Sequence, residues 1–227
     1  MHWQKLIEAS EPFRKPVKGK DPNKFYDLHM AQRNRAEWES DTGPSDREIA
    51  LLFTFLNQWG THYPSDEHYR TCFKKVYVEV PRRLRPLRGY DLIAAQFDAQ
   101  VSGAETLSET IWGVFEMLAS AGGKPYKSTG TSKILHVLRP HLFVMWDTAI
   151  RGGYAVSGSS EDYAHLFLPR VQREAREAVD SYIMENNCGP RTAVQQLEKR
   201  GGSRPLAKLV DEYNYCKFTL RCPELWE

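Results

Sequence analysis

The segment KSTGTSKILHVLRPHLFVMWDTAIR occupies residues 127–151 and has four successive parts. A polar turn rich in Ser, Thr and Gly precedes a helical pattern over about 131–138, which Pro140 ends. An apolar link, residues 142–146, then leads to Asp147 at the start of the next helix. Backbone N–H groups at a helix N-terminus attract anions. The segment therefore predicts a unit that could hold a phosphate and present a carboxylate.

Both polar parts of this segment have two interpretations. The turn could grip a DNA strand through backbone amides and lysines, or it could be an ordinary capped helix start. Asp147 could stabilise the oxocarbenium-like sugar that forms when a base is excised, or it could be a plain N-cap, and both roles could coexist. The residues that we expect to contact DNA in the turn are Lys127, Ser128, Thr129, Gly130, Thr131 and Lys133.

Apolar periodicity predicts helices along most of the remaining chain, and no segment alternates cleanly enough to be a confident strand. Ser45 and Glu48 have capping-box spacing ahead of an apolar run. Residues 8–24, rich in proline, are expected to form an arm or lid. The fold class is therefore predicted to be all-α. The helical ranges are 23–36, 45–59, 65–81, 90–97, 108–121, 131–138, 160–182, 191–200 and 205–215, with another helix opening at Asp147.

Bulk composition predicts one compact body with two lobes. The chain has 227 residues, 41% hydrophobic and 26% charged, with a net charge of +2. The longest apolar stretch, residues 142–146, is far too short to span a membrane, and the N-terminus lacks the apolar run of a signal peptide. We therefore expect a cytoplasmic protein with no membrane partner, no metal site and no cofactor. The four cysteines are too few and too irregularly spaced to form a disulfide framework, so we expect them to be reduced thiols: Cys72, Cys188, Cys216 and Cys222.

Residues 127–151 resemble the helix-hairpin-helix DNA glycosylases, the superfamily that includes endonuclease III and the alkyladenine and oxoguanine glycosylases. In that family a catalytic aspartate follows the hairpin in a context like Val-Asp-Thr-x-Ile-x-Arg, which residues 146–150 match. The resemblance implies a two-lobed fold, with residues 1–40 and 123–227 in the hairpin-bearing lobe and 41–122 in the second lobe. It also implies a monomer that flips out a damaged or modified base, the hypermodified bases of viral DNA included, and hydrolyses its N-glycosidic bond in repair or antiviral defence.

The chain departs from the family pattern in three respects. The usual hairpin sequence Leu-Pro-Gly-x-Gly is replaced by residues 123–128, and the four-cysteine motif of an iron–sulfur cluster is missing. Some family members cut the strand with a lysine, whose position falls here on Thr129; Lys127 and Lys133 are the nearest candidates for such a nucleophile. We therefore predict a monofunctional enzyme. The alternatives are a non-catalytic DNA-binding protein of the same fold and a helical protein-interaction module.

Two further groups of residues have both a DNA-binding and an ordinary interpretation. Rings could stack on a flipped base or could belong to the core. Arginines between Pro81 and Pro86 and just beyond are expected to form an extended basic loop, which could contact phosphates or could simply be solvated. The rings are Trp146, Trp112, His136 and Tyr154, and the arginines are Arg82, Arg83, Arg85 and Arg88.

Overall fold

The computed structural model describes residues 1–14, 22–33, 38, 43–59, 67–121 and 128–222, and most of them are helical. The all-α prediction is confirmed at this level. The helices before the central segment are α1 (Trp3–Ser10), α2 (Pro22–Gln32), α4 (Asp46–Gln58), α5 (Glu67–Leu84) and α6 (Leu107–Ala119). Those from it onward are α7 (Ser128–Leu138), α8 (Thr148–Gly153), α9 (Ser160–Asp162), α10 (Leu168–Asn186), α11 (Pro190–Arg200) and α12 (Leu206–Asn214).

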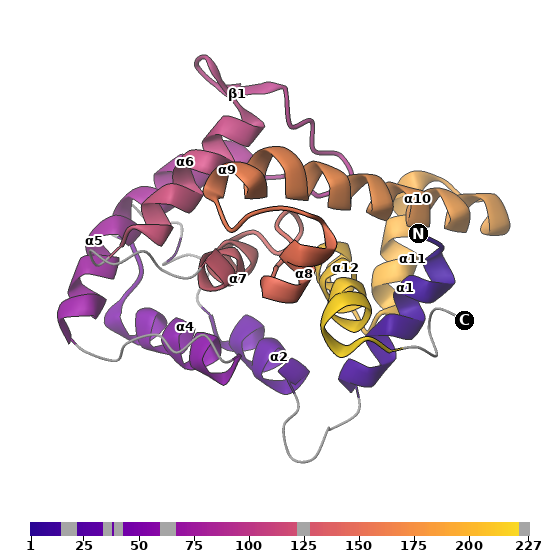
Figure 1. Ribbon diagram of the computed structural model, residues 1–227, viewed down its shortest axis with the longest axis horizontal. Coiled ribbons are helices and arrows are strands. Elements are labelled where there is room, and N and C mark those ends of the chain that lie inside the picture. Colours follow the sequence, from indigo (N-terminus) through magenta and orange to yellow (C-terminus); the bar gives the residue numbers. More distant parts are fainter. Residues whose placement is uncertain (15–21, 34–37, 39–42, 60–66, 122–127, 223–227) are drawn as a thin grey trace.

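Helix α7 lies in the middle of the molecule (Figure 1). It packs on α4 and α6, and every residue from Gly130 to Leu138 is buried. A helix that is covered all round belongs to the core of a protein. The apolar link that follows it, residues 142–146, is buried as well, and the hydroxyl of Tyr163 donates to the carbonyl of Val144 at 2.8 Å. The central segment is therefore the scaffold on which the rest of the chain packs.

Helix α1, which the sequence did not predict, joins the C-terminal half of the chain. Helix α1 packs on α12 and α10, and Trp3 contacts the edge of the Tyr182 ring at 5.1 Å between centroids. Helix α2 packs instead on α4, so part of the segment predicted for the hairpin-bearing lobe lies against the predicted second lobe. The division into two lobes remains a prediction.

Helix α5 extends further than predicted. Pro81 was expected to end it, but the helix continues to Leu84 and a 3-10 turn, Arg85–Leu87, follows. A proline inside a helix removes one hydrogen bond and costs roughly 3 kcal/mol. Here Val80, Pro81 and Leu84 are all buried, and this packing offsets the cost. Arg82 and Arg83 therefore lie on a helix, which corrects the prediction of an extended loop.

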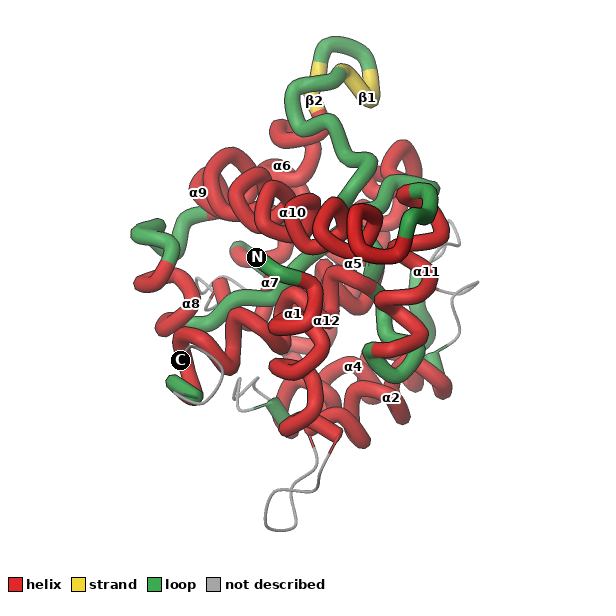
Figure 2. Tube along the Cα trace, turned by 90° about the vertical axis from the view of Figure 1, so that its right-hand side faces the viewer, coloured by secondary structure: helices red, strands yellow, loops and turns green. Residues whose placement is uncertain are grey.

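Residues 90–97 form turns rather than the predicted helix. Several of their backbone groups bond to distant partners: Leu92 N–H donates to the carbonyl of His141 at 2.8 Å, and the Gln172 amide donates to the carbonyls of Leu92 and Ala95. A short antiparallel hairpin, β1 (Gln100–Ser102) and β2 (Glu105–Thr106), follows and projects beyond the helices in Figure 2. The predicted arm is also shorter than expected, because residues 8–10 belong to α1 and 22–24 to α2, while 15–21 lie outside the described residues.

Candidate functional site

Asp147 is the N-cap of α8, and both of its carboxylate oxygens are held. Oδ1 accepts from the backbone N–H of Ile150 at 2.8 Å. Oδ2 accepts from the hydroxyl of Thr219 at 2.7 Å, and Thr219 lies on the C-terminal π-helix Tyr215–Leu220. The side chain is only half-buried. The N-cap interpretation is confirmed, and the same bonds fix the carboxylate in one orientation, as a catalytic group requires.

Lys133 lies in the second turn of α7 with its amine inside the protein. Only 7% of the residue is exposed, its Nζ donates to the carbonyl of Trp59 at 3.0 Å, and it lies 5.2 Å from the Trp59 ring centroid. Burial lowers the pKa of this amine to about 8, while the carboxylates of Asp211 and Asp147 act against that shift. Lys133 and Asp147 are therefore close enough to interact electrostatically.

Helix α12 contributes buried charges that the sequence did not reveal. Lys208 Nζ lies 2.7 Å from Asp211 Oδ2 and 3.5 Å from Glu212 Oε1. Arg204 also approaches Glu212, at 3.6 Å. Burial raises the pKa of both carboxyl groups, and Lys208 acts in the opposite direction. The spacing of Lys208, Asp211 and Glu212 is typical of a solvent-exposed ion pair on a helix, which is why sequence reasoning passed over them.

These residues form one electrostatic group, which we call the charge cluster: Lys133, Asp147, Lys208, Asp211 and Glu212. The Asp211 pKa responds to Lys208, Lys133 and Asp147, so charges on α7, at the start of α8 and on α12 influence one another. The cations balance the buried carboxylates, whereas Asp147 is the least buried of the carboxylates. An oriented and partly exposed carboxylate can stabilise a positive charge that develops on a bound molecule.

The predicted DNA-gripping turn is largely part of α7 itself, because that helix begins at Ser128 rather than near Thr131. Ser128 and Thr129 are half-buried, and Gly130 and Thr131 are buried. A hydrogen bond joins the first turn of α7 to the apolar link, because the Trp146 indole N–H donates to the carbonyl of Ser128 at 3.1 Å. Lys127 lies outside the described residues.

Three of the four rings predicted to stack on a base belong to the core, which corrects that prediction. Trp146 is 1% exposed and packs against the rings of Phe115, Tyr163 and Phe167. His136 is completely buried: its Nδ1 lies 2.7 Å from the carbonyl of Phe143, and burial lowers its pKa to about 3. Tyr154 is also buried, and its hydroxyl lies within hydrogen-bond distance of Glu174 and Asn214. The fourth ring, that of Trp112, lies at the surface, and 43% of this residue is exposed.

The four arginines predicted to contact DNA, Arg82, Arg83, Arg85 and Arg88, are all exposed, and the first two face acidic side chains. Arg82 lies 3.3 Å from Glu79, and Arg83 lies 3.6 Å from Glu105. Exposed pairs of this kind are weak, about 0–1 kcal/mol, and a phosphate could displace the acid. Arg85 and Arg88 lie at the two ends of the stretch that follows α5.

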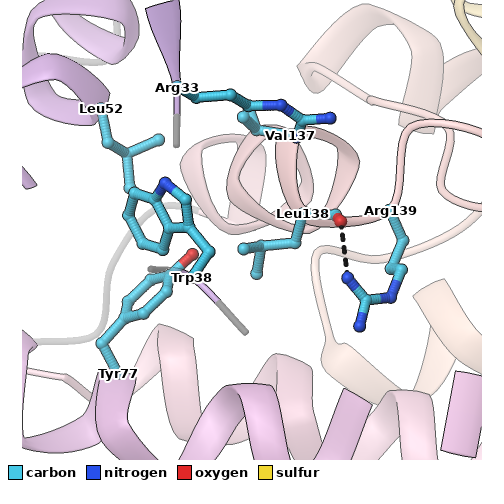
Figure 3. Close-up of a pocket in the computed structure, with 7 residues that line it drawn as sticks. All are labelled: Arg33, Trp38, Leu52, Tyr77, Val137, Leu138 and Arg139. Carbon is cyan, nitrogen blue, oxygen red and sulfur yellow. Dashed lines mark hydrogen bonds between the residues drawn. The ribbon is translucent and has the colours of Figure 1, made fainter. Parts of the chain in front are cut away.

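The C-terminal end of α7 borders a small pocket, shown in Figure 3. Arg139 donates there to the carbonyl of Leu138 at 3.0 Å, the bond drawn as a dashed line. The free volume of about 10 Å³ is room for roughly one water molecule, so a nucleobase does not fit. The lining residues are Arg33, Trp38, Leu52, Tyr77, Val137, Leu138 and Arg139.

Comparison with protein-family models, with curated proteins and with solved structures found no match. In the described part of the chain, no group of three or more His, Cys, Asp or Glu side chains is placed to hold a metal ion. Within the same residues, no helix is both long enough and apolar enough to cross a membrane.

Proposed function

We propose that this protein is a DNA glycosylase in which Asp147 is the catalytic carboxylate. The observation that carries the proposal is the orientation of a half-buried Asp147 carboxylate by Ile150 and Thr219. The buried Lys133 amine interacts electrostatically with this carboxylate. The reaction is hydrolysis of the N-glycosidic bond of a damaged or modified base that has been flipped out of the duplex. Repair and defence against foreign DNA are both roles for such a reaction.

The chemistry of base release suits a carboxylate held in this way. As the bond between sugar and base breaks, positive charge develops on the sugar, and a nearby carboxylate stabilises it. Because Asp147 is already oriented by two hydrogen bonds, it needs no rearrangement when the charge appears. In this proposal the half-buried Ser128 and Thr129 at the start of α7 and the arginines at the end of α5 contact the phosphates, whereas the burial of Gly130, Thr131 and Lys133 excludes them from such contacts.

The position of Lys133 supports a monofunctional enzyme. A pKa of about 8 would suit a nucleophilic amine, which must lose its proton before it attacks. However, the amine is directed at the carbonyl of Trp59 and is almost completely covered, so it is not presented to a sugar. In this proposal the positive charge of Lys133 balances the carboxylates of Asp147 and Asp211. The enzyme leaves the abasic strand intact. It acts as a monomer in the cytoplasm.

A second candidate function is DNA binding without chemistry. It is favoured by the burial of Trp146, His136 and Tyr154, which leaves none of these three rings free to receive a base. One experiment separates the two candidates: duplexes with single natural, alkylated, oxidised or hypermodified bases are incubated with the protein and then heated in alkali. Strand breaks at one class of base support the glycosylase, whereas retarded mobility without breaks supports the binding protein. Neither breaks nor retarded mobility would favour a protein-interaction module.

A further inference from the structure

Trp112 lies on a part of α6 that the proposed function does not use. It is 43% exposed, whereas Ile111, Val114 and Leu118 on the opposite face of the helix are buried. Tryptophan is enriched among the residues that carry most of the binding energy at protein interfaces. The ring lies at a shallow surface hollow of about 610 Å³. Its lining residues are Arg83, Glu105, Glu109, Trp112, Gly113, Glu116, Met117 and Ser120.

The rim of this hollow is acidic. Three glutamates line it against one arginine, and that arginine, Arg83, faces Glu105 at 3.6 Å. Glu109 is hydrogen bonded to Thr106, and Glu116 to the hydroxyl of Ser160, so neither bond brings a neutralising cation. Carboxylates around the ring repel phosphates. Trp112 is therefore in the wrong environment to stack on a base in DNA, and its surroundings favour a cation.

We propose that the hollow around Trp112 binds an arginine-rich peptide segment of a partner protein. A guanidinium stacked on the indole would gain a cation–π contact and would reach Glu109 and Glu116, which lie three residues before and four after Trp112 on the same helix face. Leu166, which is 42% exposed, follows His165, whose ring lies 6.1 Å from that of Trp112. It offers a neighbouring contact for an apolar residue of the same peptide.

The test is fluorescence anisotropy with a labelled peptide that alternates arginine and leucine, and a matched peptide in which glutamate replaces arginine. The full chain should bind the first peptide and not the second. Trp112→Ala should weaken binding about tenfold, because it removes the stacked ring. The helix should be unharmed, since Ala is the best helix former. The double variant Glu109→Gln with Glu116→Gln should weaken binding similarly and keep the capping bond at Thr106.

Two control variants remove an exposed apolar side chain and an exposed carboxylate elsewhere. Met184→Ala removes an apolar side chain that is 84% exposed on α10, and Glu8→Gln removes an exposed carboxylate on α1; both should bind the peptide like wild type. The proposal is overturned if the arginine peptide does not bind, or if Trp112→Ala binds it normally. It is also overturned if Trp112→Ala weakens duplex DNA binding or abolishes self-association, since the occupant would then be DNA or a second copy of the chain.

Discussion

Both oxygens of Asp147 are engaged, one by its own helix and one by a side chain 72 residues away. The first bond follows from local sequence, because Asp is a preferred N-cap residue. The second depends on how the C-terminal π-helix returns to α8, and no spacing in the sequence indicates it. Sequence reasoning could therefore find the carboxylate and its cap, but it could not find Thr219.

Thr219→Val tests whether this second bond positions the carboxylate. If it does, single-turnover base release should slow by roughly tenfold or more, because a hydrogen bond to a charged group contributes about 1.5–3 kcal/mol. DNA affinity should not change. Thr219→Ser keeps the hydroxyl and should restore the wild-type rate. Wild-type base release by Thr219→Val would show that Thr219 has no positioning role.

His29 and His136 make stability sensitive to acid. Burial lowers their pKa values to about 4 and about 3, so between these values and 6.5 the unfolded chain binds more protons than the folded chain. Each histidine therefore contributes stability that is complete above pH 6.5 and is lost as the pH falls. Asp211 and Glu212, whose pKa values are raised, act in the opposite direction. A comparison of variants is therefore needed to isolate the histidines.

His29→Leu isolates one of these two contributions. Urea unfolding at pH 6.5 and pH 4.5 should show a smaller loss of unfolding free energy in the variant, by roughly 2–3 kcal/mol, since two pH units below the usual histidine pKa correspond to about that much. Identical losses in the variant and the wild-type protein would contradict a buried neutral His29.

At the scale of elements, helix starts were predictable where a capping side chain marks them. Ser45 caps α4 by accepting from the backbone of Glu48, as the sequence predicts. The Glu48 carboxylate, however, accepts from the indole N–H of Trp38 at 2.8 Å. Helix ends were less predictable, because the burial of Val80 and Leu84 keeps α5 helical beyond Pro81. Tertiary packing determines where such a helix ends, and a proline in the local sequence does not reveal that packing.

The burial of helix α12, which contributes most of the charge cluster, was also not predictable from local sequence. All nine of its residues are buried, including three charged ones. Lys208→Met should destabilise the protein by about 3–5 kcal/mol, because Asp211 would remain buried without the cation that lies 2.7 Å away. Urea unfolding at neutral pH measures the loss. Adding Asp211→Asn and Glu212→Gln should restore part of it. Unchanged stability in the single variant would mean that the pairing is unimportant.

At the scale of the whole molecule, the net charge of +2 conceals local fields of opposite sign. The end of α5 carries exposed arginines, whereas the hollow on α6 beside it carries glutamates. The all-α class was predictable from periodicity. The neighbouring acidic and basic surfaces were not, because they form only when α5, α6 and the β1–β2 hairpin come together.

DNA affinity should fall steeply with salt, because bound phosphates release counterions. Replacing Arg83 and Arg85 by glutamate should reduce the slope of log affinity against log salt by roughly 2, about one for each phosphate that the variant no longer binds. Arg173→Glu combined with Arg191→Glu changes the net charge equally at exposed positions elsewhere and should keep the wild-type slope. An unchanged slope in the Arg83 and Arg85 variant would place the end of α5 away from DNA.

Single-turnover base release by Asp147→Asn tests the central proposal most directly. Asparagine keeps the N-cap bond to Ile150 but lacks the negative charge, so folding and DNA binding should stay near wild type. The rate of alkali-sensitive strand breaks at the modified base should fall by at least about a hundredfold, the loss typical of removing a group that stabilises transition-state charge. A variant that binds DNA normally and releases the base at the wild-type rate would contradict the assignment of Asp147 as the catalytic carboxylate.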